Sequence, residues 1–375
     1  AEKPILACFC ACVCLCLCLC LSVCVCVFPM SLCKKVRSST AWAMSLPQVS
    51  SLVSIHTPTL QSLGMELQDR FGDLLRSSTR RQDILDRKTP LVGWDSEGAH
   101  YLNPAEPETM LRYLVVLDAI NFCFWPSEEM GTPFEYDFLA SSLGKVAKEL
   151  TPENLQSLCV AEFRSWFGGM ELPAEEDRIR LLQEVGTVLL SSFEGSVETL
   201  VNRAQHSAAA LVDLVVESFP GFSDIQEFEG EKLYFLKRAQ IFVADVWGAF
   251  GGEGPGEFHD IDSLTMFADY RVPQLLREWG VLHYSPELSR TVDNKEVIPQ
   301  GSVEEVAIRA ATIQAVEELA ASGHLPSVPL SLWRWIGCCG LEERSWQKHI
   351  KFSLIIEPSP HSIEDQRGDR ELGRE

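Results

Sequence analysis

The segment KLYFLKRAQIFVADVWGAF (Lys232–Phe250) carries the longest clean helical pattern in the sequence, and the other segments are interpreted around it. Residues at spacings of three or four form one stripe: Leu236, Gln240, Val243, Trp247 and Phe250. This periodicity predicts a packed α-helix. A glycine-rich break, GGEGPGEFHD, follows, and then IDSLTMFADYRVPQLLREWGVLHY, in which Pro273 and Gly280 bracket a second, shorter helix.

Two carboxylates in this region are hard to explain as surface groups. Asp245 lies inside the apolar helix, where a charge must reach solvent or find hydrogen-bond donors. Asp269 lies in an aromatic turn before Pro273. The structural alternatives are a salt bridge for Asp245 and an N-terminal cap for Asp269, and capping or a solvated loop would also explain Asp260. We predict that Asp245 and Asp269 meet in one catalytic site.

Cations accompany these carboxylates. Arg238 and Asp245 are seven residues apart, so on a helix they project within about 20° of each other, roughly 10 Å apart along the axis. Lys237 and Arg271 are the other cations nearest in sequence. The G-x-G-x-G pattern after Phe250 follows a helix instead of a strand, so we interpret it as a connector and not as a phosphate loop.

Composition narrows the class of partner. The chain has 375 residues, 46% hydrophobic and 23% charged, with a formal net charge of -21. Such an acidic chain opposes a non-specific grip on nucleic acid or anionic lipid, which needs clustered Lys and Arg. A small-molecule substrate is therefore expected. No HExxH, CxxC, nucleophile elbow or P-loop pattern occurs, and we expect no metal or organic cofactor.

The first 47 residues read as a head outside the fold. Ten of the 14 cysteines lie within the first 33 residues, alternating with apolar residues. This spacing fits neither a zinc site nor a disulfide framework. Two interpretations remain open: a translated simple-sequence repeat, and a signal or membrane anchor over Ile5–Phe28, long enough to span a bilayer. A cytoplasmic location is expected unless this run is a signal or anchor.

The rest of the chain is predicted to be mainly α-helical with few short strands. Helical patterns occupy successive segments up to residue 321, and the clearest are at 106–124, 174–193, 233–250 and 303–321. Weak strand candidates lie around Phe228–Leu233 and near Phe352–Ile356. We expect a domain over residues 48–335, in lobes of about 48–190 and 191–335, and a divergent, partly disordered tail over 336–375.

Several segments resemble one known family. They are WDSEGAHYLNP, YLVVLDAINFCFWP, LVVESFPGFSDIQEFEG, FLKRAQIFVADVWGAF, DIDSLTMFADYRVPQLL, GVLHYSPEL and EEVAIRAATIQAVEEL, and in this order they are similar to the queuosine salvage protein family of queuosine 5'-phosphate N-glycosylase/hydrolases. The resemblance covers about residues 50–325. It implies a two-lobed fold like that of helical DNA glycosylases, and release of the base queuine and ribose 5-phosphate from queuosine 5'-monophosphate.

The resemblance also implies roles for particular residues. Breaking an N-glycosidic bond develops positive charge on the ribose, which an ionised carboxylate stabilises. Asp245 and Asp269 are the candidates for this role, and the sequence does not separate them. The candidates for binding the 5'-phosphate are the cations Lys237, Arg238 and Arg271. The candidates for stacking on the base are Phe124, Trp125, Trp247, Phe250 and Tyr270. Asp260 is a further carboxylate that could contact the substrate.

Some features of the sequence fall outside the resemblance or have an alternative interpretation. The segment after residue 335 departs from the basic, tyrosine-rich C-terminus of the family, and the cysteine-rich head has no counterpart there. Glu305 and Arg309, one helical turn apart, are interpreted as an intrahelical ion pair. The alternative function is a non-catalytic helical binding module, such as a queuine carrier. Oligomeric state is not predicted.

Overall fold

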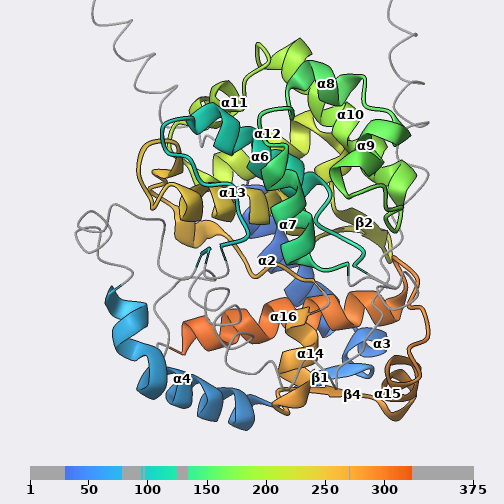
Figure 1. The fold of residues 1–375 in the computed structure, drawn as a ribbon. Coiled ribbons are helices and arrows are strands. Elements are labelled where there is room, and N and C mark those ends of the chain that lie inside the picture. Colours follow the sequence, from blue (N-terminus) through green and yellow to red (C-terminus); the bar gives the residue numbers. More distant parts are fainter. Residues whose placement is uncertain (1–29, 78–93, 96–97, 125–133, 270, 323–375) are drawn as a thin grey trace, which may run out of the picture. The chain divides into compact units, whose positions relative to one another are not determined.

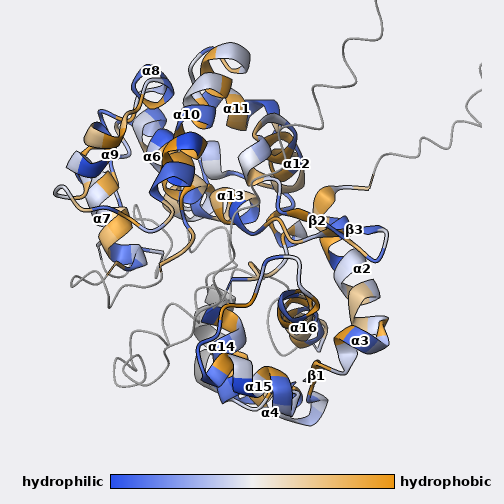
Figure 2. Cartoon of the chain, turned by 90° about the vertical axis from the view of Figure 1, so that its right-hand side faces the viewer, coloured by the Kyte–Doolittle hydropathy of each residue, from blue (hydrophilic) through white to orange (hydrophobic). Residues whose placement is uncertain are grey.

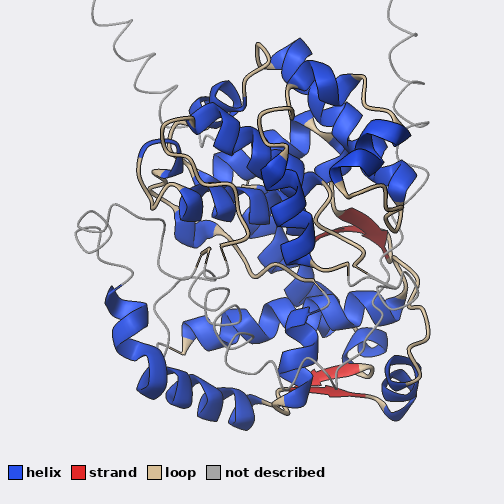
Figure 3. Ribbon diagram, in the orientation of Figure 1, coloured by secondary structure: helices blue, strands red, loops and turns tan. Residues whose placement is uncertain are grey.

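The structure is a computed structural model that describes residues 30–77, 94–95, 98–124, 134–269 and 271–322. In this part of the chain, helices dominate and only two small two-stranded antiparallel sheets occur (Figure 3). The prediction of a mainly α fold is confirmed. The expected division into lobes and the similarity to DNA glycosylases stay predictions. The strand candidate near Phe352–Ile356 lies outside the described residues.

Helix α13 (Lys237–Ala249) is buried along most of its length and packs against α6 (Pro107–Ala119) and α12 (Ala208–Ser218) (Figure 1). It begins four residues later than the predicted start at Leu233. The reason is a hairpin of β2 (Ile225–Phe228) and β3 (Glu231–Tyr234), whose turn residues Glu229 and Gly230 both have positive φ. The weak strand candidate around Phe228 is therefore confirmed, as the two strands of this hairpin.

Two helices predicted as continuous are broken in the structure. The helical pattern over residues 151–167 forms α8 (Pro152–Gln156) and α9 (Val160–Trp166), and the pattern over residues 198–220 forms α11 (Val197–Arg203) and α12. Gln205 and His206 have φ of 51° and 61°, a left-handed conformation that ends α11. The hydroxyl of Ser207 then accepts the N–H of Ala210 and caps α12. The remaining helices between residues 134 and 193 are α7 (Tyr136–Lys145) and α10 (Glu175–Ser192).

Helix α16 (Val303–Ala321) has the bounds that the sequence predicts, and its buried residues lie on all sides. Figure 2 views this helix nearly end-on. The elements that contact it are α2 (Leu32–Ser45), α3 (Pro47–Ser50), α4 (Thr57–Ser77), α14 (Arg271–Glu278) and β1 (Val53–Ile55). Strand β1 pairs with β4 (Leu282–Tyr284), and α15 (Pro286–Asp293) follows. A helix covered on every side needs apolar residues all round.

The structure corrects the predicted boundary at residue 48. Residues 32–45 form α2, in which Cys33, Val36 and Ala43 are fully buried. Arg37 pairs with Glu317 of α16 at 2.8 Å and donates to the carbonyls of Ser263 and Leu264. The segment reads as polar because serine and lysine alternate with its few apolar residues, and its helical stripe is too narrow to stand out.

None of the described helices is both long enough and apolar enough to pass through a lipid bilayer. The run Ile5–Phe28, which the sequence leaves open as an anchor, lies outside the described residues.

Candidate functional site

Asp245 of α13 is fully buried. Its Oδ1 accepts a hydrogen bond from the indole Nε1 of Trp94 at 3.0 Å, and its Oδ2 has no hydrogen-bond partner within the described residues. Burial raises the pKa of Asp245 to about 6, although His100, the Trp94 bond and the Lys237 charge each favour the ionised form. This carboxylate is therefore costly to keep ionised, a state typical of functional groups.

A chain of hydrogen bonds lies beside Trp94. His100 stacks on the indole at 4.3 Å between ring centroids. Its Nδ1 lies 2.8 Å from Asp95 Oδ1 and its Nε2 lies 2.9 Å from the Tyr136 hydroxyl. Partial burial works against ionisation of Asp95, but the hydrogen bonds from His100 outweigh it and lower the Asp95 pKa. Asp95 therefore stays a carboxylate that orients the imidazole. This chain fixes the plane of the indole that donates to Asp245.

Lys237, in the first turn of α13, lies within electrostatic reach of both predicted catalytic carboxylates. Desolvation lowers the pKa of its ammonium to about 8, and the nearby charge of Asp269 opposes this. The ammonium in turn favours ionisation of Asp245. Asp245 and Asp269 thus act on the same cation from two separate segments. The Lys237 Nζ also donates to the carbonyl of Asn121 at 2.7 Å.

Asp269 has a structural task as well. Its Oδ1 accepts the backbone N–H groups of Arg271 and Val272, at 2.9 and 3.0 Å, which opens α14. This arrangement is the cap that we considered as the alternative for Asp269. The side chain is half-buried. Capping and a role beside Lys237 are compatible, because a carboxylate has a second oxygen.

Arg238 serves the fold instead of facing Asp245. Its guanidinium donates to the carbonyls of Ala119 and Gly221 and stacks over the rings of Phe122 and Phe222. The shared helix face that the sequence predicts for Arg238 and Asp245 does not bring the two side chains into contact, because the long arginine side chain reaches the end of α6. Arg271 is exposed at the start of α14.

A second arginine, which the sequence analysis did not single out, continues this pattern. Arg178 of α10 is fully buried, and it donates to the carbonyls of Pro173, Ile120, Phe122 and Cys123. Together with Arg238 at Ala119 and Lys237 at Asn121, every carbonyl from residue 119 to residue 123 accepts from a cation. We call residues 119–123 the clamped turn. It fixes the chain between α6 and Phe124.

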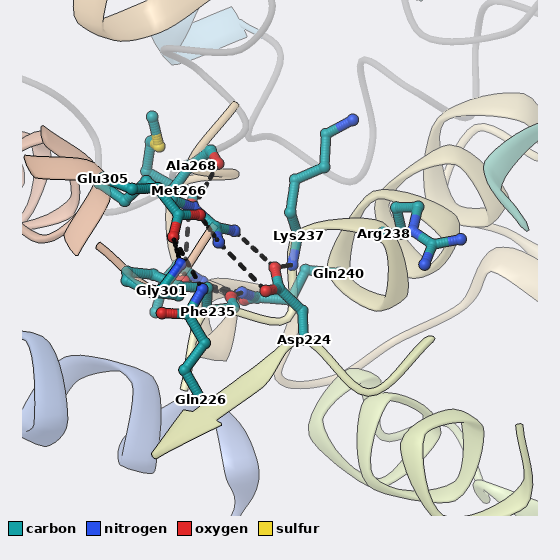
Figure 4. Close-up of polar contacts among 12 residues, drawn as sticks. Asp224, Gln226, Phe235, Lys237, Arg238, Gln240, Met266, Ala268, Gly301 and Glu305 are labelled. Carbon is teal, nitrogen blue, oxygen red and sulfur yellow. Dashed lines mark hydrogen bonds and ion pairs between the residues drawn. The ribbon is translucent and has the colours of Figure 1, made fainter. Parts of the chain in front are cut away.

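Glu305 and Arg309 form the predicted intrahelical ion pair, within a larger buried network (Figure 4). Arg309 also donates to both carboxylate oxygens of Asp224 and to the carbonyl of Ala268. Glu305 accepts from Gln226 at 3.0 Å and from the backbone of Gly301 at 2.6 Å. In Figure 4 the side chains of Lys237 and Arg238 extend away from this network. Apart from Gln226 Oε1, which has no hydrogen-bond partner within the described residues, the polar groups of this network bond to one another, so we assign it to the fold.

Asp260 caps a helix. Its oxygens accept the Ser207 hydroxyl at 2.8 Å and the backbone N–H of Ala208 at 2.6 Å, at the start of α12. This contact is the structural alternative considered for it. Contact with substrate at Asp260 stays a prediction.

The aromatic candidates divide into two groups. Phe124 follows the clamped turn, half-buried, with its ring centroid 5.1 Å from that of Phe134 and 6.5 Å from that of Tyr136. Trp247 and Phe250 instead face the loop after α13. A Cβ added at Gly252 would lie 3.2 Å from Trp247 Nε1, and one added at Gly256 would lie 2.9 Å from Phe250 Cβ. Trp125 and Tyr270 lie outside the described residues.

Asp118 of α6 is a second fully buried carboxylate near Asp245, and it was not among the site residues predicted from the sequence. The signal was present, because Asp118 interrupts the apolar run YLVVLDAINF as Asp245 interrupts its own helix. Among the described residues, no group of three or more His, Cys, Asp or Glu side chains has the arrangement of a metal site.

The fold and the site define a mostly helical protein that holds buried, incompletely paired carboxylates beside a desolvated lysine. Residues 100–324 match the profile of the queuosine salvage protein family. A queuosine 5'-phosphate N-glycosylase/hydrolase from Dictyostelium discoideum is 46% identical over 288 residues, 76% of this chain and 85% of the relative. Proteins of the same name from Sphaerobacter thermophilus and Mus musculus are 42% and 38% identical, each over 58% of this chain and over 72% and 70% of their own lengths. The chain belongs to the queuosine salvage protein family.

Proposed function

We propose that this protein hydrolyses the N-glycosidic bond of queuosine 5'-phosphate, releasing queuine for salvage into tRNA modification, and that Asp245 stabilises the reacting ribose. The family membership supports the reaction. The observation that carries the site is Asp245 itself: a fully buried carboxylate with one oxygen unpartnered in the described residues and a lysine within electrostatic reach.

The chemistry suits this environment. As the bond between C1' and the base lengthens, positive charge develops on the ribose. An ionised carboxylate in a desolvated site interacts with that charge more strongly than it would in water, and it meets no comparable charge in the ground state. At neutral pH a group with a pKa of about 6 is largely ionised. Asp245 therefore suits the role of electrostatic stabiliser.

Other residues are assigned by their surroundings. We propose that Lys237 pairs with the 5'-phosphate, because its ammonium is partly desolvated and extends away from the Asp224 network. Among the described aromatic candidates, we assign stacking on the base to Phe124, which lies beside Tyr136. We propose that Asp269 helps to keep Lys237 ionised, because its charge raises the pKa of the ammonium. A cytoplasmic location stays a prediction, which cell fractionation tests.

The test is product formation by the full-length chain. The protein is incubated with queuosine 5'-phosphate, and the mixture is analysed by mass spectrometry for queuine and ribose 5-phosphate. We expect both products in equal amounts. Binding of the nucleotide without either product would instead support the non-catalytic binding module, and release of inorganic phosphate would contradict the glycosidic reaction.

A further inference from the structure

Asp118, in the last turn of α6, is fully buried. Its Oδ1 accepts a hydrogen bond from the amide Nδ2 of Asn121 at 3.3 Å, and its Oδ2 has no hydrogen-bond partner within the described residues. The negative end of the α6 dipole also disfavours an anion at this position. A buried polar atom without a partner needs an explanation, and one explanation is a functional role.

Asp118 and Asp245 share one environment. Their helices pack against each other, and the charge of Asp245 raises the cost of ionising Asp118. From α13, Lys237 and Arg238 favour ionisation of Asp118, and the Asn121 amide does so from the clamped turn. Both carboxylates also act on the hydroxyls of Tyr113 in α6 and Tyr136 in α7, whose pKa values burial and these charges raise. Two acids facing the same groups do not ionise independently.

The surroundings separate the two acids. Asp245 has the Trp94 indole N–H, the neighbouring His100 and Lys237 to stabilise its anion, whereas Asp118 has one long amide hydrogen bond and the charges of Lys237 and Arg238. Burial first, and then the charge of Asp245, raise the pKa of Asp118 well above its ordinary value. One member of the pair therefore holds a proton while the other is ionised, the arrangement that acid–base catalysis by two carboxyl groups needs.

We propose that Asp118 is a second catalytic residue, the acid that protonates the departing base, while Asp245 faces the ribose; this rests on the proposed function. The bond between C1' and the base nitrogen breaks, and its electron pair goes to the base. The proton of the Asp118 carboxyl group goes to the same base. Water adds through oxygen to C1' and gives one proton to the Asp118 carboxylate, which restores the acid. The net change is addition of water, with no oxidant or reductant.

A leaving group that needs no proton separates this role from a structural one. Wild type, Asp118→Asn and Asp245→Asn are compared on queuosine 5'-phosphate and on 4-nitrophenyl β-ribofuranoside 5-phosphate, whose nitrophenolate departs as an anion. General acid catalysis contributes roughly 10²- to 10⁴-fold, so Asp118→Asn should lose about 100-fold or more on the natural substrate and less than about tenfold on the activated one. Asp245→Asn should lose activity on both.

The pH profile on queuosine 5'-phosphate gives a second readout. In wild type, kcat should fall below pH of about 6 as Asp245 is protonated, and fall again in alkali as Asp118 loses its proton. At saturating substrate, where the bound phosphate keeps Lys237 ionised, Asp118→Asn should keep the acidic limb and lose the alkaline one. Asp213→Asn is the matched control. Burial raises the pKa of Asp213 as it does that of Asp118, but Asp213 Oδ1 accepts a hydrogen bond from the backbone N–H of Leu32 at 2.8 Å.

The outcomes are decisive in each case. Equal losses by Asp118→Asn on both substrates, or an unchanged alkaline limb, would overturn the acid role and leave Asp118 with a structural one. If wild type cleaves only the natural substrate, the acid role of Asp118 is tested by the alkaline limb alone, compared between wild type and Asp118→Asn. If wild type releases no queuine at all, the proposed function fails, and this result is distinct from failure of the Asp118 inference.

Discussion

At the scale of single residues, the two oxygens of the Asp245 carboxylate have different environments. One oxygen accepts the Trp94 indole N–H, and the other has no partner in the described residues. The sequence reveals the anomaly, since a carboxylate interrupts an apolar helix. It does not reveal Trp94 or His100, which reach Asp245 from about 150 positions away in the chain. Long-range side-chain contacts of this kind leave no local pattern.

The first prediction concerns the stability cost of Asp245. Its pKa is raised from 3.8 to about 6, so the folded state holds more protons than the unfolded state between these values. Stability is therefore lost as pH rises through this window and stays lower above it. Asp245→Asn removes the cost and should raise the free energy of unfolding by up to about 3 kcal/mol at pH of about 8, and by much less near pH 4.

Urea denaturation of both proteins at the two pH values measures this difference. Asp137→Asn, at an exposed position of α7, is the control and should change stability little at either pH. An Asp245→Asn protein that is less stable than wild type at the higher pH would contradict the account of a costly ionised carboxylate.

The second prediction concerns the contact that holds the Trp94 indole. A Cβ added to Gly248 would lie 2.5 Å from Trp94 Cδ1, so the indole must move and its hydrogen bond to Asp245 is lost. We expect Gly248→Ala to cost roughly 1–3 kcal/mol of stability and to lower kcat. Gly144→Ala is the matched control, because its Cβ would approach nothing closer than 3.7 Å. Equal effects of the two substitutions on activity would refute the role given to Trp94.

At the scale of elements, the sequence predicts α6, α10 and α16 because their apolar residues repeat at helical spacing and their first turns carry acidic residues. It merges α11 with α12, because a single left-handed step at Gln205 and His206 does not disturb hydrophobic periodicity. It also merges β3 with α13, since KLYFL fits either a strand or a helix. The clamped turn is unpredictable for another reason: its donors come from α10 and α13.

The third prediction tests the clamped turn. Arg178→Met leaves four buried or half-buried carbonyls without their donor, and an unsatisfied buried acceptor costs about 1–3 kcal/mol. We expect a loss of about 3 kcal/mol or more in the free energy of unfolding, measured by chemical denaturation. Arg180→Met on the same helix removes only a half-exposed pair with Asp177 and should cost about 1 kcal/mol or less. Similar losses would show that the clamp contributes nothing beyond a surface arginine.

At the scale of the whole molecule, the N-terminal boundary of the fold differs from the one the sequence predicts. Helix α2 buries Cys33, Val36 and Ala43, and Thr40 accepts a hydrogen bond from Gln314 of α16 at 2.8 Å. Its polar composition hides this, because three of its polar residues, Arg37, Ser39 and Thr40, bond to other parts of the chain. The segment belongs to the fold that carries the site.

The fourth prediction follows from this packing. A chain that starts at Met44 lacks α2 and exposes the side of α16 that α2 covers, so it should unfold at markedly lower temperature or fail to fold. A chain that starts at Met30 keeps α2 and should melt within a few degrees of the full chain. Calorimetry of the three proteins checks this. Equal melting of the chains starting at Met30 and Met44 would return the boundary to residue 48.

The central claim is that an ionised Asp245 stabilises a ribose as it loses its base. The most direct measurement is the single-turnover rate of queuine release from saturating queuosine 5'-phosphate, in wild type and in Asp245→Asn, with nucleotide binding measured in parallel by calorimetry. Loss of such an electrostatic contact costs about 10²- to 10³-fold in rate. The account predicts a loss of this size with nucleotide binding retained. A variant that releases queuine at the wild-type rate would contradict it.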